Sequence, residues 1–383
     1  MTGASDRLRG IFSPSVLARL VLGWGTFLTT VVAAPWLQGT LGTPALAAVL
    51  GALVTVIVIC AFGVVEQAEH LAHRLGDPYG TLVLTLSIVV IEVILISAVM
   101  LGPGDHTTIA RDSVMAVSMI ILTLVIGVAL VVGGIRHGGM LPNRTGTSAY
   151  LSVLVVLTTV AFVMPGLIGE DGRYTTAQEI PVIAVTVLLY AFFLYRQTGA
   201  QRADFQEVTA DTPAGTSATS PARTDVREIL ATHRGEILTR AAVLLLTVLP
   251  IVLLSHDMAT LLDDGLARAG APVALSGVLI AMIVFLPETL TTVRAALQGE
   301  IQRVSNLCHG ALVSTVGLTI PAVLTIGMLT GQEVELFESP TNLAFLAVTL
   351  MLSVTTFTGR RVTALHGAAH LMVFLVFCLS IFS

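Results

Sequence analysis

The sequence contains no lysine, and charged residues of all kinds are scarce. They make up 11% of the 383 residues, whereas hydrophobic residues make up 55%. A water-facing globular surface needs more charge than this, so most of the chain must face lipid and no nucleic-acid partner is expected. The three cysteines, Cys60, Cys308 and Cys378, all fall in apolar runs. They therefore predict small packing side chains and no disulfide framework.

Long apolar runs stand where a soluble protein would have charge. Their lengths of roughly 17 to 25 residues suit helices that cross a hydrocarbon core of about 30 Å. The first 14 residues lack the pattern of a cleaved signal peptide. We therefore expect an all-α polytopic membrane protein. Eleven membrane spans are predicted, at 15–36, 44–65, 80–101, 113–134, 148–168, 180–196, 237–256, 272–297, 305–330, 341–358 and 361–382.

The arginines predict how these spans are oriented. If the N-terminus is cytoplasmic, 16 of the 19 arginines lie in cytoplasmic segments, and Arg111, Arg173 and Arg268 lie outside. Positive charge retards the translocation of short loops across a membrane. The distribution therefore favours a cytoplasmic N-terminus and a C-terminus on the outside.

A polar stretch divides the chain into two similar parts. Residues 197–236 are rich in Ala, Thr, Ser, Gly and Pro, which predicts a flexible cytoplasmic linker. Before it come an N-terminal segment with a leading helix, 1–43, and a first repeat, 44–196; a second repeat, 237–383, follows it. Each repeat has an apolar span, a short amphipathic stretch closed by Gly-x-Pro, and a span with one acid. Five spans is an odd number, so we expect two inverted five-helix repeats, which place a shared site near the midplane.

Two acids, Glu92 and Glu288, are the only ones of the 24 that fall within predicted spans, and they occupy matching places in the repeats. An ionised carboxylate in hydrocarbon costs about 2.5–3.5 kcal/mol on insertion scales, so such a residue is a candidate functional site. The alternative is a structural acid, neutral or hydrogen-bonded to a neighbouring Ser or Thr. Every arginine maps to a loop or a helix end. We therefore predict that a mobile cation or protons supply the missing positive charge.

Three stretches of the sequence carry a resemblance to a known family. They are "EQAEHLAHRLGDPYGTLVLTLSIVVIEVILI", "FLPETL" with "QGEIQRVSNLCHGALVSTVGLTIP", and "GRRVTALHGAAHL". Together they resemble the ChaA-type bacterial calcium (sodium, potassium)/proton antiporters of the calcium/cation antiporter superfamily, over nearly all of 15–383. In that family one glutamate from each repeat binds the cation or protons, which implies these roles for Glu92 and Glu288. The resemblance also implies a leading helix followed by two inverted five-helix repeats.

The resemblance extends to the polar residues beside the glutamates. The fourth and ninth spans supply polar neighbours in the family, which implies Ser118 and Ser314 or Thr315 in this chain. The wider superfamily sets Gly-Asn before each glutamate, whereas Ile88-Val89 and Val284-Phe285 stand there in this sequence. Ca²⁺ normally takes about six to eight oxygen ligands, and fewer side-chain oxygens are available here. We therefore expect weaker selectivity for Ca²⁺ than the full motif gives.

The function predicted is secondary antiport, not enzymatic catalysis. The expected cargo is Ca²⁺, a monovalent cation (Na⁺ or K⁺), or both, exchanged for H⁺ across the bacterial plasma (inner) membrane, with lipid as the surroundings and no cofactor. A cation exchanger without a proton step is the alternative within transport. An intramembrane enzyme is the alternative from another class, although no activated nucleophile accompanies the glutamates and no His-Glu-x-x-His motif occurs.

Four further residues have two interpretations each. His366 and His370 lie one helical turn apart, a spacing that can chelate a metal, but packing or hydrogen bonding near an interface is the expected role. Pro287 and Pro321 remove backbone donors, which either frees carbonyl groups toward a cavity or produces an ordinary membrane-helix kink.

Overall fold

The computed structural model describes residues 13–37, 41–75, 78–100, 107–208, 226–271 and 274–382, and within these ranges it consists of helices without a β-strand. The helices in chain order are α2 (Pro14–Leu37), α3 (Thr43–Leu75), α4 (Tyr79–Met100), α5 (Ile109–Met119), η1 (Ile120–Val125), α6 (Ile126–His137), α7 (Arg144–Thr158), η2 (Thr159–Val163), α8 (Met164–Ile168), α9 (Thr176–Thr198), η3 (Arg202–Phe205), α10 (Val226–Arg268), α11 (Ala274–Val284), α12 (Leu286–Gln298), α13 (Ile301–Thr330), α14 (Pro340–Thr358) and α15 (Ala364–Ile381).

The chain forms two compact units, and each takes segments from both predicted repeats. Unit 1 contains Met1–Leu84 and Thr209–Thr291, and unit 2 contains Thr85–Val208 and Thr292–Ile381. Helices α4 and α12 each pass from one unit into the other. The sequence repeats are therefore not the structural units, because each repeat contributes its first helices to one unit and its later helices to the other.

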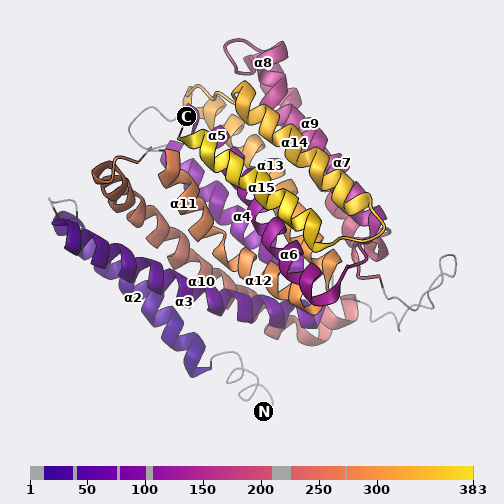
Figure 1. Cartoon of the computed structure of the whole chain (residues 1–383), viewed down its shortest axis with the longest axis horizontal. Helices are drawn as coiled ribbons and strands as arrows, with labels where there is room; N and C mark the ends of the chain where they lie inside the picture. The colour runs from indigo at the N-terminus through magenta and orange to yellow at the C-terminus, as the bar shows by residue number, and fades with distance from the viewer. Residues whose placement is uncertain are drawn as a thin grey trace. The chain divides into compact units, whose positions relative to one another are not determined.

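Unit 1 is built on the long helices α3 and α10. They pack along each other and α2 packs against both (Figure 1). The indole of Trp24 in α2 donates to the carbonyl of Leu246 in α10 at 3.0 Å. Thr30 donates to the carboxylate of Asp257 at 2.8 Å. These bonds satisfy polar groups that lipid cannot, and thereby tie α2 to α10.

Unit 2 is organised around α13. Of its 30 residues 22 are buried, and it packs against α5, α7 and α9. A helix that is covered on all sides belongs to the interior of its bundle. Helices α6 and α15 of the same unit approach each other closely, since a Cβ at Gly367 would lie 2.6 Å from the carbonyl oxygen of Gly127. Small residues allow such close helix contact in membranes.

Two spans of unit 2 contain π-helical turns. The turn η1 joins α5 to α6, and η2 joins α7 to α8. Such turns break the regular i to i−4 hydrogen-bond pattern and are often found at functional sites. The carbonyl of Leu122 within η1 accepts a hydrogen bond from His370 Nδ1 at 2.7 Å. The histidine thus satisfies a backbone carbonyl within the π turn.

The helices agree with most of the predicted spans. Within the described ranges, nine helices are long and apolar enough to cross a membrane, and each coincides with a predicted span. The other two predicted spans, 80–101 and 272–297, correspond to α4 and to α11 with α12. These are the segments that carry the two glutamates, and the second is interrupted at Phe285.

The predicted flexible linker, residues 197–236, is partly ordered. The structure describes 197–208, where η3 follows α9, and α10 already begins at Val226, while 209–225 lie outside the described residues. Phe205 is buried and its ring lies 5.1 Å from that of Tyr150 and 5.9 Å from that of Phe193. Composition indicated disorder, but the buried aromatic side chain of Phe205 helps to anchor the start of the linker.

Candidate functional site

Glu92 lies in the middle of α4, and its carboxylate meets a hydroxyl from α13. Thr315 Oγ1 donates to Glu92 Oε2 at 2.9 Å, and Thr315 is fully buried. The other carboxylate oxygen, Oε1, is buried without a hydrogen-bond partner among the described residues. Both residues belong to unit 2. A buried carboxylate with one oxygen engaged and one oxygen available is suited to bind a cation or a proton.

Ser314 and Thr315 follow each other in α13 but face different helices. Ser314 accepts a hydrogen bond from the hydroxyl of Tyr190 in α9 at 3.0 Å. Successive side chains on an α-helix are separated by about 100° around the axis, so two neighbours can contact two different helices. Of the two predicted hydroxyls, Thr315 is the one that contacts Glu92.

Ser118 lies in α5, two residues before the π-helical turn η1 begins at Ile120. Its hydroxyl donates to the carbonyl of Val114, four residues earlier, at 2.6 Å, and its side chain is fully buried. This i to i−4 bond is the usual arrangement for Ser and Thr within helices. The hydroxyl hydrogen is thus used within its own helix, and the lone pairs on Ser118 Oγ are what it can offer to a cation.

Glu288 has a different setting in unit 1. It lies in the first turn of α12, directly after the interruption at Phe285, and its side chain is 4% exposed. Its predecessor Pro287 has no N–H, so the helical bond from residue 287 to the carbonyl of residue 283 cannot form. The first turn of a helix favours negative charge because its N–H groups point toward it.

The two histidines of α15 have separate partners. His366 Nδ1 lies 2.9 Å from the hydroxyl of Thr363 and accepts from its backbone N–H at 3.1 Å, at the start of the helix. His370 contacts the Leu122 carbonyl and, through Nε2, the Thr356 hydroxyl at 3.3 Å. In the described part of the chain, no group of three or more His, Cys, Asp or Glu side chains is arranged to hold a metal ion. The hydrogen-bonding role expected of this pair agrees with these contacts.

Two buried residues near the Glu92 contact were not predicted from the sequence. Tyr190 was missed because α9 appears as a simple lipid-facing span, and its contact with Ser314 joins residues 124 positions apart. Thr319 lies one turn beyond Thr315, and its buried Oγ1 has no hydrogen-bond partner among the residues that the structure describes. Its i, i+4 spacing from Thr315 was the available signal.

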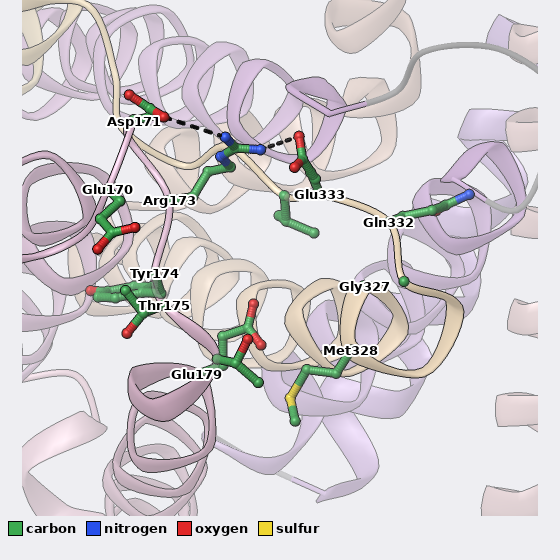
Figure 2. Close-up of a pocket in the computed structure, with 13 residues that line it drawn as sticks. Glu170, Asp171, Arg173, Tyr174, Thr175, Glu179, Gly327, Met328, Gln332 and Glu333 are labelled. Atoms are coloured by element: carbon green, nitrogen blue, oxygen red, sulfur yellow. Dashed lines mark ion pairs between the residues drawn. The ribbon is translucent and has the colours of Figure 1, made fainter.

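An acidic cavity lies elsewhere in unit 2, between the α8–α9 turn and the end of α13. Its volume is about 470 Å³. Figure 2 shows Arg173 between Asp171, at 3.7 Å, and Glu333, with which it also forms an ion pair. Burial raises the pKa of the neighbouring Tyr174 to about 12, so its phenol remains a donor, to the carbonyl of Val160 at 2.5 Å. The acidic residues that line the cavity are Glu170, Asp171, Glu179 and Glu333.

Solved structures share this arrangement of helices. The H⁺/Ca²⁺ exchanger CAX matches with a TM-score of 0.65 at 13% identity, covering 95% of this chain and 87% of that one. YfkE matches with a TM-score of 0.61 at 15% identity, covering 95% and 99%. The sodium–calcium exchanger NCX_Mj matches with a TM-score of 0.57 at 12% identity, covering 94% and 99%. At these identities the likeness shows the fold, which is that of polytopic cation exchangers.

Sequence comparison identifies the family. The profile described as "Sodium/calcium exchanger protein" matches residues 45–199 and 239–382. The putative ionic transporter y4hA of Sinorhizobium fredii (strain NBRC 101917 / NGR234) is 36% identical over 322 residues, covering 83% of this chain and 84% of that protein. The sodium-potassium/proton antiporter ChaA of Escherichia coli (strain K12) is 31% identical over 332 residues, covering 85% and 87%.

The chain therefore belongs to the sodium/calcium exchanger family. It is a multi-pass membrane protein and a cation antiporter of that family. The predicted resemblance to ChaA-type antiporters and the all-α polytopic fold are confirmed.

Proposed function

We propose that this protein exchanges a cation for protons across the bacterial plasma membrane, with Glu92 as a carboxylate that binds either one. The observation that carries the proposal is the buried contact of Glu92 Oε2 with Thr315, which leaves Oε1 available. A carboxylate at such a place in a membrane helix needs a positive charge or a proton to offset its burial. Protons and cations then compete for the same oxygens.

The proposal gives Glu288 the corresponding role in the second repeat. It rests on the matching places of the two glutamates in the sequence and on the position of Glu288 at the start of α12. The charge of each carboxylate is offset when it holds a proton or a cation, whereas an empty carboxylate keeps its negative charge. Conformational change of the empty site is therefore slow, and that difference enforces exchange over leak.

The cargo we propose is Ca²⁺, Na⁺ or K⁺, with limited preference for Ca²⁺. Support comes from the apolar residues Val89 and Phe285, which stand where the superfamily has Asn. Similar proteins cover both kinds of cargo, since ChaA is a sodium-potassium/proton antiporter and CAX an H⁺/Ca²⁺ exchanger. Ser118, Thr315 and Thr319 add hydroxyl oxygens that lie in the same unit as Glu92. Water and backbone carbonyls complete the shell of a cation that takes about six or more ligands.

The orientation we propose has the N-terminus in the cytoplasm and the C-terminus outside, on the strength of the arginine distribution. The segment around Thr216 and Ser220 would then be cytoplasmic. Single cysteines at these positions are expected to be protected from an impermeant thiol reagent in intact cells. Labelling from outside would show that the orientation is the reverse of the one proposed.

The test of the exchange uses purified protein in vesicles with an imposed pH gradient. Uptake of Ca²⁺, Na⁺ and K⁺ and the accompanying proton movement are measured separately for wild type, Glu92→Gln and Glu288→Gln. Gln is nearly isosteric with Glu but carries no charge, so each variant should fold and lose proton-coupled flux. A folded Gln variant that exchanged at the wild-type rate would make that glutamate structural.

A cation exchanger without a proton step gives a different result in the same vesicles. Its flux would require a second cation on the opposite side and would ignore the pH gradient. That outcome would retain the antiport and remove the proton from the mechanism.

A further inference from the structure

Helix α9 has one narrow buried face, which contacts α13 at Tyr190 and α7 at Gln197. Its buried residues are Thr186, Tyr190, Phe193 and Gln197, spaced by four, three and four positions. This spacing defines a single stripe along an α-helix, and α9 packs against α13. Three of the four residues are polar, an unusual proportion for a buried stripe on a membrane helix. The polar residues of this stripe therefore make specific contacts in addition to packing.

Tyr190 is held in this stripe by a polar and a steric contact. Its hydroxyl donates to Ser314 Oγ at 3.0 Å, and both side chains are buried. Its ring lies against Gly317, where an added Cβ would stand 3.0 Å from two ring atoms. Gly317 thus leaves room for the ring, and the hydrogen bond to Ser314 fixes the position of the hydroxyl at the end of the ring.

The bond from Tyr190 fixes the Ser314 hydroxyl on the face of α13 that meets α9. Ser314 is turned toward α9 by Tyr190, and its neighbour Thr315 is directed toward Glu92. Because the two side chains lie about 100° apart on the same helix, turning one away from its partner moves the other.

We propose that Tyr190 is a positioning residue for the cation site, acting through Ser314 and α13 on the Thr315–Glu92 contact. This inference rests on the proposed function of Glu92. Tyr190 itself touches neither Glu92 nor the cation. Its effect should appear in how well the cation competes with protons, because the Thr315 hydroxyl stabilises the ionised carboxylate that the cation binds.

The experiment compares Tyr190→Phe with wild type in vesicles with an imposed pH gradient. The apparent KM for the cation should rise about three- to tenfold, the range that loss of one buried hydrogen bond produces, and the maximal rate should stay within about twofold. The pH at half-maximal uptake should move upward, because a proton competes better for a carboxylate that has lost part of its hydrogen bonding. A merely structural tyrosine would alter neither the pH profile nor KM selectively.

The matched control is Tyr150→Phe. Tyr150 is also buried in unit 2, but its hydroxyl accepts from Gln197 and its ring packs on Phe205. This variant should keep the wild-type KM and pH profile. Ser314→Ala removes the acceptor of the Tyr190 bond, and it should reproduce the changes of Tyr190→Phe without adding to them in the double variant.

Two outcomes would overturn the inference. The first is a folded Tyr190→Phe protein whose KM and pH profile match those of the Tyr150→Phe control. The second applies if Tyr190→Phe does not fold, and it is a Ser314→Ala protein with wild-type KM and pH profile. Glu92→Gln in the same assay separates this inference from the proposed function. If Glu92→Gln abolishes coupled flux while Tyr190→Phe changes nothing, the role of Tyr190 alone is wrong.

Discussion

The two glutamate-bearing segments, α4 and α11–α12, place their buried carboxylates in different surroundings. Helix α4 is continuous over 22 residues, and Glu92 meets a hydroxyl from another helix. The second segment is interrupted at Phe285, and Glu288 lies in the first turn of the helix that follows. One carboxylate accepts a hydrogen bond from a side chain of another helix, and the other lies in the first turn of its own helix, where negative charge is favoured.

The difference has a consequence for the chemistry available at each glutamate. A continuous helix uses its carbonyls internally, so Glu92 must obtain further oxygens from side chains such as Thr315. A helix interrupted beside Pro287 leaves the carbonyl of Ile283 without the N–H that would normally bond to it. Near Glu288 the backbone itself can offer an oxygen to a cation. We expect the two sites to respond to different substitutions.

The largest effect is expected at Thr315, which serves the Glu92 side. Thr315→Val keeps the shape and removes the donor, and a hydrogen bond to a charged group contributes about 1.5–3 kcal/mol, so the apparent KM should rise by about tenfold or more. Thr315→Ser keeps the hydroxyl and should restore most of the affinity. The measurement is cation uptake against concentration in vesicles.

Thr158→Val is the control for Thr315→Val. Thr158 is also buried in unit 2, but it donates to the carbonyl of Leu154 in its own helix at 2.7 Å. Its replacement should leave KM unchanged. Equal KM values for Thr315→Val and Thr158→Val would remove the distinction between the two glutamate environments.

How much of this site could be predicted from the sequence depends on whether the signal is local. The run 80–101 placed α4 within one residue of Tyr79–Met100, because length and apolarity fix a membrane helix. The two prolines differ in the structure. Helix α13 continues through Pro321, whereas the helix before Pro287 is interrupted at Phe285, two residues earlier. The choice between them depends on packing, which a single sequence does not encode locally.

Long-range contacts account for what could not be predicted. The bond of Asn306 to the carbonyl of Phe205, at 2.8 Å, joins residues 101 positions apart. Neither residue alone signals it, and the composition around Phe205 indicated a flexible linker. The π-helical turn η1 is likewise invisible in a run of apolar residues, since its pattern differs from α-helix by one extra residue.

The second prediction tests the Glu288 side. Pro287→Ala restores an N–H that can bond to the carbonyl of Ile283, so that carbonyl is no longer available to a cation. The apparent KM should rise by about threefold, a smaller change because water can replace one weak carbonyl ligand. Thermal stability should not fall, because alanine is the better helix former.

Pro250→Ala in α10 provides the matched control for Pro287→Ala. Pro250 is a buried helix proline in the same unit as Glu288. Its replacement is expected to preserve KM. If Pro287→Ala left KM unchanged as well, the backbone near Glu288 would contribute no ligand, and the contrast with α4 would be one of shape alone.

The third prediction concerns the residues one turn before each glutamate. Val89 and Phe285 are both buried, and each lies three positions before its glutamate, Val89 on the same face of α4 as Glu92 and Phe285 at the interruption before α12. Val89→Asn and Phe285→Asn each add an amide oxygen and should raise the Ca²⁺ to Na⁺ uptake ratio about threefold. This ratio corresponds to a free-energy difference of less than about 1 kcal/mol. Val89→Ala and Phe285→Ala control for lost volume, with melting temperatures measured alongside. An unchanged ratio in a folded double Asn variant would mean that neither position faces the ion.

The smallest effect is expected from shortening the linker between the repeats. This experiment tests whether the difference between α4 and α11–α12 depends on these helices alone. The start of the linker is bonded to unit 2, since the backbone N–H of Arg303 in the first turn of α13 donates to Glu207 Oε1 at 2.8 Å. Deleting 212–219 leaves Phe205 and Glu207 in place, and shortening the 17 residues between Val208 and Val226 to nine changes the closure entropy by less than about 1 kcal/mol. Transport should therefore stay within about twofold of wild type. Extending the deletion back to residue 205 removes the cap on α13, the helix that presents Thr315, and should lower the melting temperature and weaken cation affinity. If the two deletions behaved alike, the contact between the linker and α13 would have no part in holding Thr315 against Glu92.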